Sequence, residues 1–229
     1  MKLLKIGFMC MSSLIVAQGV DQVNPMVLDD KYLEDQFYFG TGINFLLDKP
    51  DDVGQNSLSY SLQLGFIKDI PMNQRRNIGM GIGLGYAANS FYNNVRVAQN
   101  EMGFNYAIVS ADDFKRNKLE THTVEMPVQL RWRTSNASEY KFWRLYTGLR
   151  LGYVFSGRSK FVDDMGSEAF SNDDIEPFQY GLTVNFGYNT LNLHAYYGLN
   201  RLLKQGIQTA DGVEINFRVL RVGIMFYIL

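Results

Sequence analysis

The stretch Phe178-Gln-Tyr-Gly-Leu-Thr-Val-Asn-Phe-Gly-Tyr188 decides the fold, because apolar residues alternate in it with small or polar ones. Successive side chains of a β-strand point to opposite faces, so a period of two indicates a strand between two different environments. One face of this segment is aromatic and aliphatic, and the other carries glycine, glutamine, threonine and asparagine. Its length also suits a tilted strand that crosses a bilayer, which takes about 9–11 residues.

Seven further segments of the chain show the same alternation. They cover residues 37–47, 58–66, 78–86, 124–133, 143–153, 191–200 and 220–228. Their polar faces hold mostly Gly, Asn, Gln and Tyr with a few charges, which suits a confined interior better than bulk solvent. We therefore predict an all-β fold, an eight-stranded antiparallel transmembrane β-barrel with long extracellular loops.

The connections between these segments alternate in length. The long ones cover residues 48–57, 88–121, 156–176 and 201–215, and the shorter ones cover 68–77, 134–141 and 189–190. Outer-membrane barrels have long extracellular loops and short periplasmic turns, so we expect both termini on the periplasmic side.

Aromatic residues gather near both ends of the apolar rows, whereas Leu, Val, Ile and Met occupy the middle. Such bands are typical of the two membrane–water interfaces, and a soluble barrel gives no reason for them. We predict an aromatic girdle that includes Trp132, Trp143, Tyr153, Tyr188 and Phe226.

The N-terminus has the features of a secretory signal peptide. Lys2 and Lys5 precede a mostly apolar stretch over residues 6–17, which is too short to span a bilayer. Cleavage after Ala17 or after Gly19 fits the small residues there, and the sequence does not separate the two. We predict a signal peptide over 1–19, a periplasmic segment over 20–35 and the barrel over 36–229.

Composition excludes several classes of protein and site. The formal net charge of -1 argues against a nucleic-acid partner, which normally selects a basic excess. The single cysteine, Cys10, lies within the signal peptide, so disulfides and Cys-ligated metal sites are not expected. We predict no cofactor and no metal ligands.

The inward rows carry a cluster of charged and polar side chains. Its members are Glu125, Gln129, Arg131, Arg144, Arg150, His194 and Arg221. We expect Glu125 to lie near Arg150 or Arg144 across adjacent strands. The cluster suits either a polar pathway or a salt-bridged core, and eight strands leave a lumen that side chains about fill. The alternating glycines at 79–85 favour the filled lumen, because they leave room for larger side chains from facing strands.

Other candidate sites carry weaker signals. Pro127 lies within a strand, where it predicts a bulge. His194 and His122 have no evident serine and acid partners for a catalytic triad, so we predict no catalytic residues and no enzyme. The acidic loop Asp163–Glu176 suits either Ca²⁺ or plain solvation, and its spacing matches no EF-hand. Asp69, Arg75 and Arg76 are expected in a turn, either solvated or facing a periplasmic partner.

The second long connection is expected to carry strand pairs beyond the membrane. Residues 95–97 and 106–109 have the required composition, and Phe91, Tyr92, Phe104 and Tyr106 lie among polar residues. Exposed aromatic hairpins suit a partner surface, although packing within the loop is the more common use.

Three motifs resemble the outer-membrane β-barrel domain proteins of Bacteroidota, which are labelled porin-family or PorT-like. These motifs are His122-Thr-Val-Glu-Met-Pro-Val-Gln-Leu-Arg-Trp132, Phe66-Ile-Lys-Asp-Ile-Pro-Met-Asn-Gln-Arg-Arg-Asn77 and Tyr146-Thr-Gly-Leu-Arg-Leu-Gly-Tyr153. The resemblance covers essentially the whole mature chain. It implies a barrel in the outer membrane of a Gram-negative bacterium, and it implies no catalytic residues.

The main functional hypothesis is a non-enzymatic outer-membrane barrel with a packed lumen and a structural, adhesive or accessory role through its loops. Three alternatives remain: a narrow pore or small-solute binder, an accessory subunit of a type IX secretion or other outer-membrane machine, and a lipid-modifying enzyme. The expected partners are outer-membrane lipid and lipopolysaccharide, and a protein that contacts the extracellular loops or periplasmic turns.

Overall fold

The fold is all-β in a computed structural model that describes residues 35–55, 57–101, 103–134 and 142–228. The elements in chain order are β1 (Gln36–Leu47), β2 (Tyr60–Pro71), β3 (Ile78–Tyr92), β4 (Val95–Asn100), β5 (Gly103–Ile108), η1 (Ala111–Asp113), β6 (Arg116–Arg133), β7 (Trp143–Val162), β8 (Ser167–Ser171), β9 (Phe178–Tyr188), β10 (Leu191–Gly198) and β11 (Arg218–Ile228). The predicted signal peptide and residues 20–34 lie outside the described residues.

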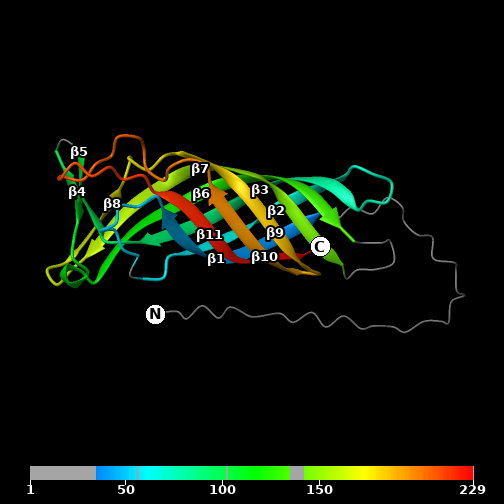
Figure 1. Ribbon diagram of the computed structural model, residues 1–229, viewed down its shortest axis with the longest axis horizontal. Helices are drawn as coiled ribbons and strands as arrows, with labels where there is room; N and C mark the ends of the chain where they lie inside the picture. Colours follow the sequence, from blue (N-terminus) through cyan, green and yellow to red (C-terminus); the bar gives the residue numbers. More distant parts are fainter. Residues whose placement is uncertain (1–34, 56, 102, 135–141, 229) are drawn as a thin grey trace, which may run out of the picture.

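The main sheet closes on itself as a barrel (Figure 1). Nine strands form the sheet, and β8 pairs with the outer end of β7, so the other eight make the ring β1-β2-β3-β6-β7-β9-β10-β11. The ring closes where β1 pairs antiparallel with β11, from Phe37 opposite Ile228 to Leu47 opposite Arg218. The prediction of an eight-stranded antiparallel barrel is therefore confirmed.

Each barrel strand keeps the two faces that its sequence pattern predicts. In β9, Phe178, Tyr180 and Leu182 are exposed on the outside, whereas Thr183 and Asn185 are buried inside. The outer wall is thus apolar and the lumen polar, the arrangement of a barrel that lies in lipid. No helical element in the described residues is long and apolar enough to cross a membrane.

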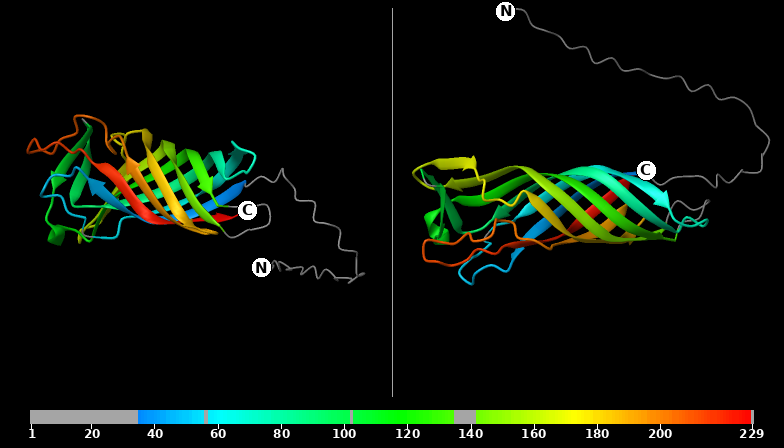
Figure 2. Two further views of the ribbon diagram at one scale, coloured as in Figure 1. Left: turned by 45° about the vertical axis from the view of Figure 1, so that its right-hand side comes forward. Right: turned by 90° about the horizontal axis from the view of Figure 1, so that it is seen from above.

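The barrel has two unlike ends. One end, the loop end, carries the connections over residues 48–59, 93–115, 163–177 and 199–217, and Figure 2 shows β4, β5 and β8 gathered there. The other end, the turn end, carries the connections 72–77 and 189–190 together with the start of β1 and the finish of β11. This alternation follows the prediction, and it places the turn end in the periplasm in an outer-membrane barrel.

Three barrel strands run farther toward the loop end than predicted. β3 continues to Tyr92, β6 begins at Arg116, and β7 continues to Val162, where β8 pairs with it. The expected loops at 88–121 and 156–176 are therefore partly wrong. A bulge hides the pattern: His122 faces Ser156 and Thr123 faces Val154, so Phe155 is an extra residue in β7. Outward positions of β7 are odd-numbered before this bulge and even-numbered after it.

The bulge does not lie at Pro127, where it was predicted. The register between β6 and β7 runs unbroken through Pro127 opposite Arg150. On the other side, the β3–β6 ladder pairs Ile82 with Val128 and Gly85 with Glu125 but skips the positions between them. Proline has no N–H to donate, so it interrupts one ladder here without shifting the register.

An apolar cluster closes the loop end of the lumen. It joins residues from the loops and from the outer ends of the strands, and we call it the loop-end cluster; its members are Leu46, Val53, Phe91, Val95, Val97, Tyr106, Leu119, Val154, Ile175, Tyr196, Leu202, Leu203, Ile215, Phe217 and Val219. The β4–β5 hairpin contributes to it as a separate two-stranded sheet. The strand pair predicted at 95–97 and 106–109 is thus present, and Val95, Val97 and Tyr106 pack inward.

Candidate functional site in the barrel lumen

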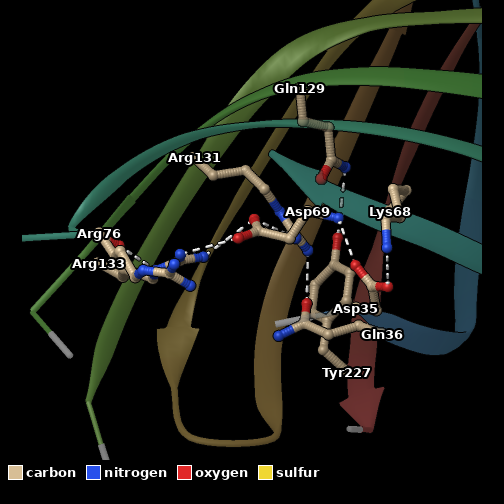
Figure 3. Close-up of polar contacts among 9 residues, drawn as sticks. All are labelled: Asp35, Gln36, Lys68, Asp69, Arg76, Gln129, Arg131, Arg133 and Tyr227. Atoms are coloured by element: carbon tan, nitrogen blue, oxygen red, sulfur yellow. Dashed lines mark hydrogen bonds and ion pairs between the residues drawn. The ribbon is translucent and has the colours of Figure 1, made fainter. Parts of the chain in front are cut away.

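An ion-pair cluster fills the turn end of the lumen (Figure 3). Asp69 on β2 is 1% exposed and lies between two arginines of β6. Arg131 Nη1 donates to its Oδ1 at 2.9 Å, and Arg133 donates to both carboxylate oxygens at 3.0 and 2.8 Å. Arg133 Nε also donates to the Arg76 carbonyl at 2.6 Å. The prediction that Asp69 lies in a turn is wrong, because β2 continues to Pro71.

Glycine spacing makes room for this cluster. A Cβ added at Gly81 would lie 2.9 Å from Arg131 Cδ, so a larger residue there would displace the arginine. The Arg131 guanidinium stacks over the Tyr146 ring at 4.3 Å and donates to Gln36 Oε1 at 2.5 Å. The glycines of β3 therefore serve the filled lumen that the sequence suggests, by letting a long side chain cross the barrel.

Asp35 seals the rim of this cluster. Its carboxylate accepts from Lys68 Nζ at 2.6 Å and from the Asp69 backbone N–H at 2.9 Å. Burial by itself would raise the pKa of Asp35, but these two hydrogen bonds and the nearby positive charges lower it overall. The segment that enters β1 is thus fixed to β2 by an ionised carboxylate.

A second ion-pair cluster occupies the middle of the lumen. Glu125 on β6 accepts from Arg150 Nη1 at 2.8 Å and pairs with Arg221 Nη1 at 3.7 Å. Arg150 also donates to Gln63. Of the two neighbours predicted for Glu125, the structure thus selects Arg150.

Arg221 connects four strands through these contacts. From β11 it donates to Asn44 of β1 at 3.1 Å and to Asn89 of β3 at 2.7 Å, in addition to the Glu125 pair on β6. Asn44 lies on a predicted polar row and Asn89 in the loop expected at 88–121, and neither was among the predicted lumen residues. Amides are uncharged, so composition alone does not separate them from solvated loop residues.

The other predicted lumen residues lie apart from the two carboxylates. Arg144 is 2% exposed, and its guanidinium faces the Phe142 ring at 4.6 Å. Gln129 donates to the Tyr227 hydroxyl at 3.4 Å, and His194 Nδ1 contacts Asn185 Oδ1 at 2.8 Å. All three side chains are inside the barrel. Gln129 and His194 extend the polar filling of the lumen, and Arg144 lies opposite Arg133 at the turn end.

One small cavity lies between the central cluster and the loop-end cluster. Its volume is about 30 Å³, and Glu125, Arg150, Arg221, Phe91 and Leu202 are among its lining residues. A water molecule needs about 10–15 Å³ by this measure, so the cavity has room for about two waters. It is far smaller than the several hundred Å³ of a small-molecule site.

The sequence of the chain matches the family described as outer membrane protein beta-barrel domain over residues 16–204. The chain belongs to this family. No curated protein matches it. As a member of the outer membrane barrel family, the protein lies in the outer membrane of a Gram-negative bacterium.

Two solved structures are similar to the chain at low identity and low TM-score. The attachment invasion locus protein Ail of Yersinia pestis, solved with the heparin analogue sucrose octasulfate, is 15% identical, with 85% of this chain and 99% of that chain covered and a TM-score of 0.32. A triple mutant of the Rhodopseudomonas blastica porin is 10% identical, with 86% of this chain and 100% of that chain covered and a TM-score of 0.20.

The girdle residues lie on the lipid-facing wall of this outer-membrane barrel. Trp132, Trp143, Tyr153 and Tyr188 are exposed, and Phe226 is half-buried. Trp143 packs against Tyr188 with ring centroids 5.4 Å apart at the turn end. At the loop end, Tyr86 packs with His122 and Phe155, with ring centroids about 6 Å apart.

The carboxylates of the acidic loop contact different partners and do not converge on one point. Asp163 accepts from two backbone N–H groups of its own turn, Asp164 pairs with Lys115, Glu168 with Arg96, and Asp174 accepts from Tyr106. In the described part of the chain, no three carboxylate, histidine or cysteine side chains gather as a metal site would require.

Proposed function

We propose that the protein is a non-enzymatic, non-conducting outer-membrane barrel that acts through its loop end. The observation that carries this proposal is a lumen obstructed in three layers. Buried arginine–carboxylate pairs obstruct its turn end and its middle, and the loop-end cluster covers the other end. An ion in transit would have to displace paired charges and then cross packed apolar side chains, and both steps are costly.

Single-channel recording in planar bilayers tests the closed lumen. We expect the purified barrel to give no steady conductance steps. Arg150→Ala opens the middle layer, and Arg75→Ala is its control, because Arg75 is exposed in a turn outside the lumen. Steady steps from the wild type that change with Arg150→Ala but not with Arg75→Ala would refute the proposal and favour a narrow pore.

The loop end offers a folded surface for a protein partner. β4, β5, β8 and the outer ends of β6 and β7 form sheet structure there, and Met165 projects from the β7–β8 turn with 94% of its surface exposed. β8 pairs only with β7 among the described strands, so its second edge is available to another chain. These features support an adhesive or accessory role.

Affinity purification from native outer membranes tests this role. We expect a partner to co-purify with the wild type and to be lost with Met165→Asp, whereas Met72→Asp at the turn end keeps it. Recovery of the barrel alone under gentle extraction would count against an accessory role. A PorT-like task in type IX secretion by a bacterium of the Bacteroidota is the narrower form of this proposal and rests on the motif resemblance.

Lipid modification is disfavoured by the surroundings of the two histidines. His194 contacts the amide oxygen of Asn185, and His122 contacts the Tyr86 hydroxyl at 2.5 Å. Within the described ranges, neither ring is bonded to a serine or a carboxylate. Mass analysis of lipid A from a host that expresses the barrel is expected to find it unchanged.

A further inference from the structure

The outer wall of β6 and β7 carries positive charge just beyond its lipid-facing part. Arg116 and Lys118 on β6 and Arg158 and Lys160 on β7 lie on one face, opposite to the face on which Leu119 joins the loop-end cluster. Lys118 faces Lys160 directly across the two strands. Like charges in this position destabilise a sheet. Lys118 is buried and bonded to Glu120, so Lys160 is the member of the pair that lacks an acidic partner.

Most of this charge has no counterpart within the protein. The acid on the same face, Glu120, is bonded to Lys118. Among the residues that the structure describes, Arg116, Arg158 and Lys160 have no carboxylate within ion-pair distance. We call Arg116, Arg158 and Lys160, which are at least partly exposed, the basic row.

The height of the basic row matches a layer of lipid headgroups. The aromatic set of Tyr86, His122 and Phe155 marks the end of the apolar wall, and Arg158 follows Phe155 after the bulge. Two residues of a tilted strand rise about 5 Å along the membrane normal, so the basic row lies roughly 5–10 Å above this aromatic set. The headgroup layer is about 5–8 Å thick on each side of the hydrocarbon.

An apolar groove lies below the basic row on the same wall. It has a volume of about 340 Å³ and runs between two rows of side chains from β6, β7 and β9. Tyr153 and Phe178, with ring centroids 5.2 Å apart, form its upper side, and Leu151 and Tyr180 form its lower side.

We propose that this wall binds a phosphorylated, acylated glycolipid of the outer leaflet, with an acyl chain in the groove and phosphates on the basic row. The two features need each other for this assignment. A groove in the lipid wall accepts any chain, and a basic row accepts any anion, but their succession along β7 matches a lipid of this chemistry. The site lies outside the lumen and is independent of whether the lumen conducts.

Native mass spectrometry of the refolded mature chain tests the site. The probes are hexa-acyl lipid A with two phosphates, the same lipid without phosphates, and phosphatidylglycerol. We expect the bis-phosphorylated form to bind most tightly. The double variant Arg158→Gln/Lys160→Gln should lose roughly ten- to thirtyfold in affinity for it, because each basic residue near an anionic surface contributes on the order of 1 kcal/mol.

Two further variants separate the parts of the site. The control variant Arg75→Gln/Lys204→Gln also removes two exposed positive charges, but neither residue is on β6, β7 or β9. Its affinity for bis-phosphorylated lipid A should stay within about twofold of the wild type. Leu151→Trp fills the groove and should weaken both forms of lipid A. Heat-dependent gel mobility verifies that each variant is folded, and the single variant Lys160→Gln replaces the double variant if that does not fold.

Two results would overturn the proposal. One is wild-type affinity of the folded Lys160 variant for bis-phosphorylated lipid A. The other is equal binding of phosphatidylglycerol and lipid A, which would indicate a general attraction for anionic lipid.

Discussion

Replacing Asp69 with asparagine should destabilise the barrel far more than the loss of a surface carboxylate. Asp69 is 1% exposed and holds two arginines through contacts of 2.8–3.0 Å. The asparagine side chain would be isosteric but would present an uncharged amide to both guanidiniums. Breaking a buried ion pair by removing one partner costs about 3–5 kcal/mol, and we expect a loss in this range.

Urea unfolding in lipid vesicles measures this loss, with Trp132 and Trp143 at the same end of the barrel as fluorescent reporters. For a slope of about 1–3 kcal/mol per M, the predicted loss moves the midpoint by roughly 1–5 M. Asp164→Asn is the matched control: Asp164 pairs with Lys115 at 2.5 Å but is almost fully exposed, so its removal should leave the midpoint unchanged. A midpoint for Asp69→Asn no lower than that of the control would refute the buried ion-pair argument.

Three further predictions concern packing and ionisation. Gly85→Ala should lower the free energy of unfolding by about 1–3 kcal/mol or prevent folding, because the new Cβ would lie 1.8 Å from a tyrosine hydroxyl. Gly166→Ala is the control and should leave the urea midpoint unchanged, because a Cβ there would meet open space. Phe217→Ala should cost about 3–5 kcal/mol within the loop-end cluster and speed proteolysis of the loops, whereas Val213→Ala should not. Tyr106 is buried, which raises its pKa above the ordinary value of 10.0, and the nearby Asp174 carboxylate raises it further despite the Asn172 hydrogen bond. The Tyr106 hydroxyl therefore loses its proton at a lower pH in the unfolded chain than in the folded one, so the stability of the loop end should fall as pH rises above about 10. Proteolysis rates measured over a pH series report this fall, and Tyr106→Phe should reduce it.

The sequence predicts the barrel well because the constraint is periodic. A strand that separates lipid from a polar lumen must alternate at every position, and β9 coincides with the predicted segment Phe178–Tyr188. Prediction fails at the loop end, where both faces of the sheet meet protein or water. There the bulge at Phe155 reverses the parity of β7, and β8 carries no regular alternation.

The lumen is only half predictable for a similar reason. Alternation places Arg131 and Glu125 inside, but it does not say which partner each one meets. Asp69 shares the face of Gln63 along β2, so extending the alternation past Phe66 would have found it. Partner choice depends on strand order and stagger across the barrel, and a single sequence contains no direct signal for either.

The contacts of Arg221 bear on how the barrel is assembled. β11 follows the other seven strands of the ring in chain order, and its arginine contacts Asn44 from β1, Asn89 from β3 and Glu125 from β6. An open sheet that lacks the β1–β11 seam cannot offer all three. Until the seam forms, this guanidinium must keep its hydration or face lipid without a counter-charge. Joining of the first and last strands and neutralisation of Arg221 are therefore one coupled event, and Arg221→Ala should leave a population of inserted but unsealed sheets that remain accessible to protease at the seam.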